Sequence, residues 1–315
     1  MTASFLEYFF LVPSLAISLF FVVPLSGVLV RFRANYTPRG LSLDTEGSAV
    51  PHTGPVVSSY FSMFRRVLKI EGFQGLYKGL MPTFITALTV SLAILTFMDS
   101  PGHRHNSYRA PTAGILGTFL YSILMMLISL PSAIITYRAI TTPHRLPYFG
   151  LMKSLRVLLT PTERRKPWII YLTPGLLASQ CLHVAYVTLV LAPLHRLLVP
   201  LDSESGPGTV AYPEISPIKL SIYFVVVIVS AAILTPLEVM STRLAIQRNQ
   251  ASAEYNSVSQ EVDGDAEEVA ELRTEAEPYT GLVDCAKTII NEEGFRALYR
   301  AWWITLLGGL VSALA

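Results

Sequence analysis

The sequence predicts an all-α membrane protein with six transmembrane helices, arranged as three repeats of two helices with shorter helices between them. Four observations support this prediction. Hydrophobic residues make up 51% of the 315-residue chain and charged residues only 15%, whereas soluble domains carry about 25% charged residues. The hydrophobic residues form long blocks, most basic residues lie between alternate blocks, and a proline–arginine unit occurs three times.

The first three hydrophobic blocks are expected to be membrane-spanning helices. A helix needs about 20 apolar residues to cross a bilayer, because each residue adds about 1.5 Å to its length. We expect spans at about residues 5–30, 81–98 and 112–137. The second block is short, but it contains no charged residue.

The last three spans are expected at about residues 172–191, 218–240 and 301–315. The sixth is the shortest. A helix over its residues is only about 22 Å long, whereas the hydrocarbon core of a bilayer is about 30 Å thick. We expect either a tilted helix in a thin part of the bilayer or a sequence that ends early. The successive pairs of spans define repeat 1 (residues 1–100), repeat 2 (101–200) and repeat 3 (215–315).

The basic residues predict which helix ends share one side of the membrane. Residues 31–80, 138–171 and 241–300 contain 20 of the 24 lysines and arginines. Positive charge gathers on one side of membrane proteins in this way. Both termini are therefore expected on the opposite, charge-poor side.

A proline followed seven residues later by an arginine stands near the polar end of each odd-numbered span. The three copies are Pro24 with Arg31, Pro131 with Arg138, and Pro236 with Arg243. Their prolines are 107 and 105 residues apart, a nearly constant period that indicates an internal repeat. Proline inside a helix removes a hydrogen bond and kinks the chain. Three kinks at one depth would draw the three helices together.

A second motif precedes two of the even-numbered spans. It runs from Glu71-Gly72 to Tyr77-Lys78-Gly79 in repeat 1 and from Glu293-Gly294 to Tyr299-Arg300-Ala301 in repeat 3. Repeat 2 keeps only a remnant around Lys166-Pro167-Trp168. Together the two motifs resemble those of the mitochondrial carrier family.

The resemblance implies a fold and a set of lipid contacts. The fold is a six-helix barrel with pseudo-threefold symmetry, short matrix-side helices, and a central cavity that opens alternately to each side. In the family the second motif binds the membrane lipid cardiolipin, and free N–H groups at helix N-termini favour such an anion. The alternative is that the glycines only cap helices and the aromatic residues lie at the membrane interface. The matching residues in this chain are Gly72, Tyr77, Lys78, Gly79, Gly294, Tyr299 and Arg300.

The sequence departs from the family at the residues that close the cavity. Carriers use acid–base pairs at six positions, which here are Ser26, Leu29, Ala133, Thr136, Glu238 and Ser241. Glu238 alone among these is charged, and an isolated carboxylate within a membrane is costly. We expect Glu238 to pair with a motif arginine such as Arg243, or to take up a proton. The family's ion-paired gate is expected to be lost.

The predicted cavity contains few polar residues. The candidates for substrate contact are Thr86, Thr89, Gln180, His183 and Tyr186. Gln180 and His183 are three residues apart and therefore share a helix face. His183 is either a neutral imidazole bonded to a neighbouring helix or a group that contacts a substrate or proton. We expect no fixed positive charge at mid-depth, so burial of a highly charged anion would be too costly.

One further region has a distinctive composition. Residues 249–278 contain nine acidic residues and one basic residue, which predicts a disordered loop that acts as a solvated spacer or as a docking segment.

No catalytic nucleophile motif, phosphate-binding loop or metal-ligand cluster occurs in the sequence, so we expect no enzymatic activity, cofactor, metal or nucleic-acid partner. The leading hypothesis is a carrier-type transporter with an unknown small-molecule substrate, in the inner mitochondrial membrane rather than the outer. The alternative is a carrier-fold adaptor that does not transport, and that acts with a protein partner in mitochondrial fusion or organisation at the outer membrane.

Overall fold

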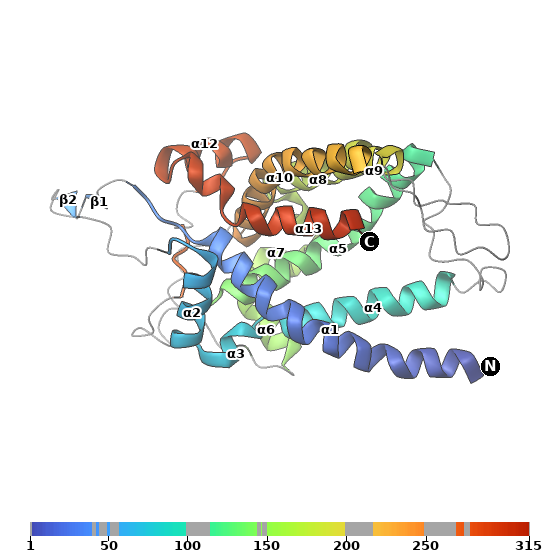
Figure 1. The fold of residues 1–315 in the computed structure, drawn as a ribbon. Helices are drawn as coiled ribbons and strands as arrows, with labels where there is room; N and C mark the ends of the chain where they lie inside the picture. Colours follow the sequence, from blue (N-terminus) through green and yellow to red (C-terminus); the bar gives the residue numbers. More distant parts are fainter. Residues whose placement is uncertain are drawn as a thin grey trace.

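The computed structural model describes residues 2–39, 42–43, 49–50, 57–98, 114–143, 146, 150–198, 217–248, 269–273 and 278–314. Long helices run side by side along the molecule (Figure 1). They are α1 (Thr2–Ala34), α4 (Leu80–Met98), α5 (Gly114–Thr141), α8 (Leu176–Tyr186) with α9 (Ala192–Leu198), α10 (Pro217–Ile246) and α13 (Trp302–Leu314). The π-helix η2 (Val187–Leu191) joins α8 to α9 without a break.

A helix lies at each of the six positions where a span is expected. Within the described residues, four stretches are long and apolar enough to cross a membrane. They are Val12–Ala34, Gly114–Thr141, Leu176–Leu198 and Pro217–Ile246. The crossing of the membrane by α4 and α13 stays a prediction.

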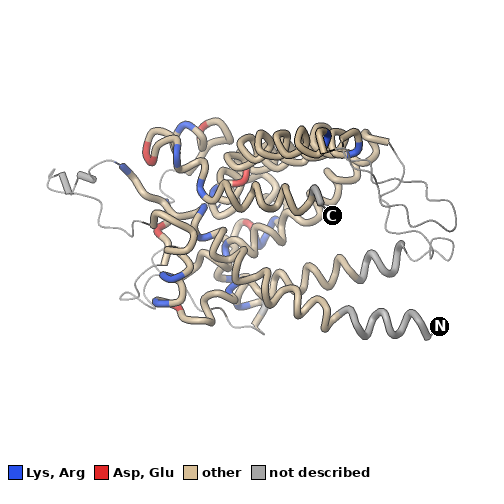
Figure 2. Tube along the Cα trace, viewed as in Figure 1, with Lys and Arg blue, Asp and Glu red and all other residues tan. Residues whose placement is uncertain are grey.

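Short elements gather at one end of the molecule (Figure 1). They are α2 (Tyr60–Ile70), α3 (Gly72–Leu76), α6 (Leu151–Leu158), α7 (Pro161–Arg165), η1 (Pro167–Leu172), α12 (Leu282–Glu292) and η3 (Phe295–Tyr299). Figure 2 shows most of the described lysines and arginines there, and we call this region the charged end. The antiparallel pair β1 (Ser42–Leu43) and β2 (Ala49–Val50) extends beyond it.

The amphipathic pattern of α2 shows how these short helices attach to the long ones. Ser59 caps the helix, because its side chain accepts a hydrogen bond from the N–H of Ser62 at 3.2 Å. Tyr60, Met63 and Val67 follow at spacings of three and four residues and are all buried. They form one apolar face, which packs on α1 with Val28 and Phe32 in a single cluster.

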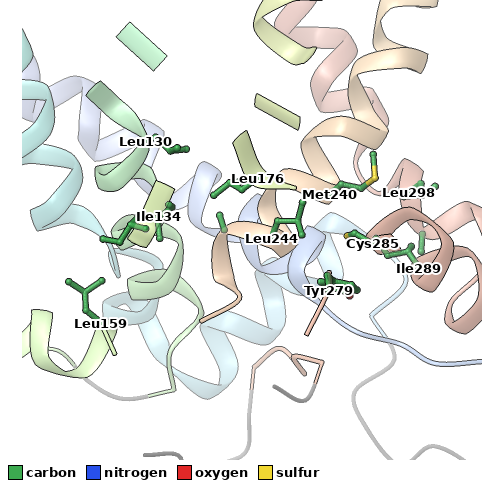
Figure 3. Close-up of a cluster of buried hydrophobic side chains, with 13 residues drawn as sticks. Leu130, Ile134, Leu159, Leu176, Met240, Leu244, Tyr279, Cys285, Ile289 and Leu298 are labelled. Atoms are coloured by element: carbon green, nitrogen blue, oxygen red, sulfur yellow. The ribbon is translucent and has the colours of Figure 1, made fainter. Parts of the chain in front are cut away.

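A second apolar cluster joins the long helices to α12 (Figure 3). Ile134 of α5, Leu244 of α10 and Ile289 of α12 are almost completely buried in it. Farther from the charged end the long helices expose large apolar side chains, such as Phe21 of α1 and Val225 of α10. Such a surface is unusual for a soluble protein and typical of contact with lipid.

Part of the acidic insert is ordered. Residues 249–268 and 274–277 lie outside the described residues, but residues 269–273, which we call the strap, lie across the charged end. Val269 and Ala270 are buried in the apolar cluster around α2. The backbone N–H of Tyr36 donates to the carbonyl of Glu271 at 2.8 Å.

The prediction of a disordered loop is therefore wrong for the strap. Val269 and Ala270 anchor this segment together with hydrogen bonds from Arg66 and to Asn35, although the residues around them are mostly acidic.

Candidate functional site

Three arginines connect the odd-numbered long helices to one another at the charged end. Each arginine uses its Nε to donate a hydrogen bond to a backbone carbonyl of the next helix. The three bonds are Arg31 to Ile140 at 3.0 Å, Arg138 to Ala245 at 3.3 Å, and Arg243 to Arg33 at 3.1 Å. The contacts run from α1 to α5, from α5 to α10 and from α10 back to α1, so they form a closed cycle. We call Arg31, Arg138 and Arg243 the arginine ring.

The ring satisfies groups that the helices themselves leave unpaired. Each accepting carbonyl belongs to the next-to-last residue of its helix. The last four carbonyls of an α-helix have no partner within the helix, and they carry the negative end of its dipole. Three converging helix ends would therefore repel one another, and the three guanidinium groups supply both the missing donors and the opposite charge.

Each ring arginine also holds a carboxylate from a neighbouring short element. Arg31 donates to Glu71 at 2.6 Å, and Arg138 holds both oxygens of Glu163 at 2.7 and 3.0 Å. Arg243 likewise bonds both oxygens of Glu293, one of them at 3.0 Å. These arginines are 2%, 2% and 6% exposed, respectively. Charges buried to this extent need such pairing to be tolerated.

Glu163 was not predicted from the sequence, because repeat 2 keeps only a remnant of the second motif. Thr160 and Glu163 form a reciprocal capping box at the start of α7, with the N–H of Thr160 donating to Glu163 at 3.0 Å. The sequence contains this signal as a threonine followed three residues later by a glutamate. Glu163 thus caps α7 and neutralises Arg138 at the same time.

The basic residues of the second motif also point to these carboxylates. The Nζ of Lys78 lies 2.5 Å from Glu71 and donates to the carbonyl of Thr142 at 3.0 Å. Arg300 lies 3.0 Å from Glu293 and bonds the carbonyl of Asn35.

The other residues predicted to bind lipid surround these pairs. Gly72, Gly79 and Gly294 have φ of 69°, 87° and 88°, a backbone conformation that favours glycine. The hydroxyl of Tyr77 donates to the carbonyl of Phe20 at 3.3 Å, and the ring of Tyr299 contacts that of Phe295. The lipid role of all these residues stays a prediction.

A different kind of ion pair lies between α1, α10 and α13. The Nη2 of Arg33 is 2.5 Å from the Oε2 of Glu238 and 2.9 Å from the hydroxyl of Thr305. Thr305 in turn donates to Glu238 at 2.6 Å. We call Arg33 and Glu238 the interior pair.

This pair corrects one expectation. Glu238 does not pair with Arg243, because the guanidinium of Arg243 is filled by Glu293 and by two carbonyls. Glu238 instead pairs with Arg33 of α1, a residue outside the six gate positions, so one ion pair still joins two odd-numbered helices. Arg33 was missed because it stands nine residues after Pro24, where the other two repeats have Ile140 and Ala245.

Glu238 faces the interior of the bundle. It follows Leu234, Ala231 and Val227 at spacings of four, seven and eleven residues, and those three side chains are 7%, 5% and 1% exposed. Residues at such spacings lie on one helix face. The exposed Val225 and Val229 lie on the opposite side of α10. The side chain of Glu238 is nevertheless 24% exposed.

Two more polar side chains lie within electrostatic range of the interior pair. His183 of α8 and Tyr137 of α5 each interact with both Glu238 and Arg33. His183 is on the same face of α8 as the buried Leu176 and Ser179, at spacings of seven and four residues. Of the predicted cavity residues, His183 is thus the one that the structure brings to the interior pair.

Three of the other predicted cavity residues make hydrogen bonds to nearby groups. The hydroxyl of Thr86 bonds Ser132 of α5, and that of Thr89 donates to the carbonyl of Ile85 at 2.8 Å. The hydroxyl of Tyr186 lies 3.1 Å from that of Ser230 in α10. Gln180 is half-buried on α8. The contacts of Thr86 and Tyr186 join neighbouring helices, that of Thr89 lies within α4, and none of these residues adds a charge.

Burial changes the acidity of several groups at the charged end. It raises the pKa of the Cys285 thiol in α12 to about 12. It raises the pKa of Tyr36 to about 12 as well, with a smaller contribution from the hydrogen bond to Glu292. Burial lowers the pKa of Arg300 to about 10, against the opposing effect of Glu293. All three groups therefore keep their ordinary protonation state at neutral pH.

One family model matches the chain, and its description is mitochondrial carrier protein. The match covers residues 14–101 and 220–315, together more than half of the chain. These two stretches contain the two complete copies of the second motif, and the stretch between them contains the remnant. No curated protein sequence matches the chain.

Proposed function

The chain belongs to the mitochondrial carrier family, and we propose from this membership that it transports a small solute across the inner mitochondrial membrane by alternating access. All six long helices span the membrane in this proposal, and the charged end faces the matrix. The three pairs of spans then correspond to three repeats around one axis.

The arginine ring is the observation that best supports this function. Its three Nε–carbonyl bonds use equivalent positions of α1, α5 and α10 and close one end of the bundle. A transporter that alternates must open this end in one state and close it in the other. Because the ring is made of hydrogen bonds between helices, it can break between repeats while each arginine keeps its own carboxylate.

The interior supports a solute of low net charge. Arg33 and Glu238 together carry no net charge, and the polar residues nearest to them, Tyr137, His183 and Thr305, add no fixed charge when the histidine is neutral. A nucleotide or a dicarboxylate would enter with charges that this set cannot balance. The adaptor alternative gains no support from the structure and is not proposed.

Uptake by purified protein in liposomes tests the proposal. We expect saturable uptake of at least one solute of low net charge, and faster uptake when the same solute is present inside. Such acceleration is the mark of a single site that faces the two sides in turn. Protein-free liposomes and heat-unfolded protein are the controls. Folded protein that takes up nothing from a broad panel would contradict the proposal.

A further inference from the structure

We propose that Arg33, Glu238 and Thr305 bind a small zwitterion in which a carboxylate and an ammonium group lie close together, as they do in a free amino acid. This inference rests on the proposed transport function and names its substrate class. It is carried by the unused hydrogen-bonding capacity of Arg33, by the direction of Glu238 and by the charge balance of the site.

Arg33 is buried but not saturated. It is only 8% exposed, and both side-chain hydrogen bonds that it makes to described residues come from Nη2. Its Nε is buried and has no partner among the described residues. A buried donor without an acceptor costs about 1–3 kcal/mol, more when the group is charged. Such an orphan in a native structure calls for an explanation.

The ring arginines show that the orphan is not a general feature of this end of the molecule. The Nε of Arg31, of Arg138 and of Arg243 each reaches a carbonyl. The Nε of Arg33 differs although it lies only two residues from Arg31. A ligand carboxylate is the group that best fits this vacant donor, because a guanidinium binds carboxylates through parallel N–H bonds.

Glu238 supplies the complementary half of the site. Its carboxylate contacts Arg33 of α1 and Thr305 of α13 and is still 24% exposed, so a cation that enters between these helices can reach it. Thr305 holds its Oε2 at 2.6 Å, which fixes the orientation of the carboxylate. An ammonium group of a ligand would find here an acceptor of opposite charge.

Charge balance selects a ligand with both charges. A simple carboxylate would gain Arg33 but would be repelled by Glu238, and a simple amine would meet the reverse situation. A zwitterion compensates both buried charges and adds no net charge to a medium in which net charge is costly. Because its two groups compete with the Arg33–Glu238 contact, binding would also loosen the tie between α1 and α10.

Binding of three matched probes tests this inference independently of transport. The probes are L-alanine, propionate, which lacks the ammonium group, and ethylamine, which lacks the carboxylate. Ligand-induced rises in the unfolding midpoint of the purified full-length protein give the affinities. We expect L-alanine to bind at least about tenfold more tightly than either analogue, as one charged hydrogen bond is lost in each case. Equal binding of L-alanine and propionate, or no binding of any probe, would overturn the proposal.

Substitutions assign the binding to the two charges. Glu238→Gln should weaken L-alanine binding about tenfold to a hundredfold and should not weaken propionate, so the preference is lost or reversed. Arg33→Gln should abolish binding of both. Arg165→Gln, which removes an exposed arginine of α7, is the control and should change neither. An unchanged preference in Glu238→Gln would contradict the assignment.

A folding defect does not remove the test. Should Arg33→Gln fail to fold, the double substitution Arg33→Gln with Glu238→Gln restores a neutral, hydrogen-bonding pair of similar shape, and L-alanine should still fail to bind to it.

The two proposals also fail separately. Binding of L-alanine without uptake of any solute leaves the site assignment standing and contradicts transport. Uptake of other solutes without L-alanine binding supports transport and contradicts the site assignment.

Discussion

Two kinds of buried arginine lie within a few residues of each other in this protein. The ring arginines Arg31, Arg138 and Arg243 each hold one carboxylate and at least two backbone carbonyls. Arg33 holds one carboxylate and one hydroxyl, and its Nε has no partner in the described part of the chain. The first kind joins helix ends to one another, and the second keeps a buried donor that no described residue uses.

This difference separates stability from ligand binding. A saturated ion pair has nothing left to offer a ligand, so the ring is suited to holding the helices together. An unsaturated pair is less favourable for the empty protein but can be completed by a solute. Arg33 takes part in both regions, because its backbone carbonyl accepts from Arg243 while its side chain meets Glu238. A ligand at Arg33 is thus placed next to the bonds that hold the charged end closed.

The largest expected effect is on stability, from the ring. Arg138→Met removes the guanidinium that bonds both oxygens of the Glu163 carboxylate, and both side chains are at most 1% exposed. Breaking a buried pair from one side costs about 3–5 kcal/mol. We expect a large fall in the unfolding midpoint of the protein in detergent, measured by thermal unfolding. Arg33→Met should lower the midpoint much less, since Glu238 is 24% exposed.

The double substitution Arg138→Met with Glu163→Gln is the matched control for this prediction. It also removes the buried negative charge that Arg138 neutralises, and it should recover part of the midpoint. A fall of similar size in Arg33→Met and Arg138→Met would remove the distinction between the two kinds of arginine.

The next effect measures how tightly the charged end is packed. Gly175, just before α8, has a φ of 77°, and a Cβ there would lie 2.3 Å from the backbone nitrogen of Leu282. Gly175→Ala should therefore cost at least about 1–3 kcal/mol through backbone strain alone. Gly308 of α13, where a Cβ would meet nothing within 4 Å, is the control. A harmless Gly175→Ala would show that this end adjusts more freely than the contacts indicate.

A smaller effect is expected from the strap. Arg273 holds both oxygens of Glu292 at 3.1 and 3.0 Å and lies over the ring of Tyr279. This pair is partly exposed, and exposed pairs contribute at most about 1 kcal/mol. Arg273→Gln should thus shift the unfolding midpoint only slightly and leave the ring intact. A loss as large as that of Arg138→Met would place the strap among the principal supports of the charged end.

The smallest effect concerns chemistry rather than stability. Burial raises the pKa of Cys285 to about 12, so the thiol stays protonated and unreactive as long as the charged end is folded. In the Cys181→Ser variant, a maleimide should label Cys285 slowly at pH 7 and pH 8 and rapidly after unfolding. Rapid labelling of the folded protein would mean that α12 separates readily from the cluster around Leu244.

The sequence predicted the parts of this arrangement that repeat. Proline and arginine at a constant period identified all three ring arginines, and the second motif contains two of their carboxylates, Glu71 and Glu293. Glu163 lacks the glycine that marks the other two, so it could be recognised only as part of a helix cap.

The remaining parts have no repeat to reveal them. Arg33 has no charged counterpart in the other repeats, and its partner Glu238 lies 205 residues away. The strap depends on two apolar residues whose burial requires α2 as a neighbour. Contacts of this kind arise from the packing of segments that are far apart in the sequence. They cannot be predicted from composition or from spacing along the chain.

The most direct test of the account compares two glutamates in parallel. The L-alanine-induced rise in unfolding midpoint is measured for the unmodified protein, for Glu238→Gln and for Glu71→Gln, whose side chain pairs with Arg31 and Lys78. We expect Glu71→Gln to lower the midpoint of the unliganded protein and to keep the rise, and Glu238→Gln to lose the rise with a smaller change in the unliganded midpoint. The reverse pattern, or loss of the rise in both variants, would contradict the separation of structural and ligand-binding arginines.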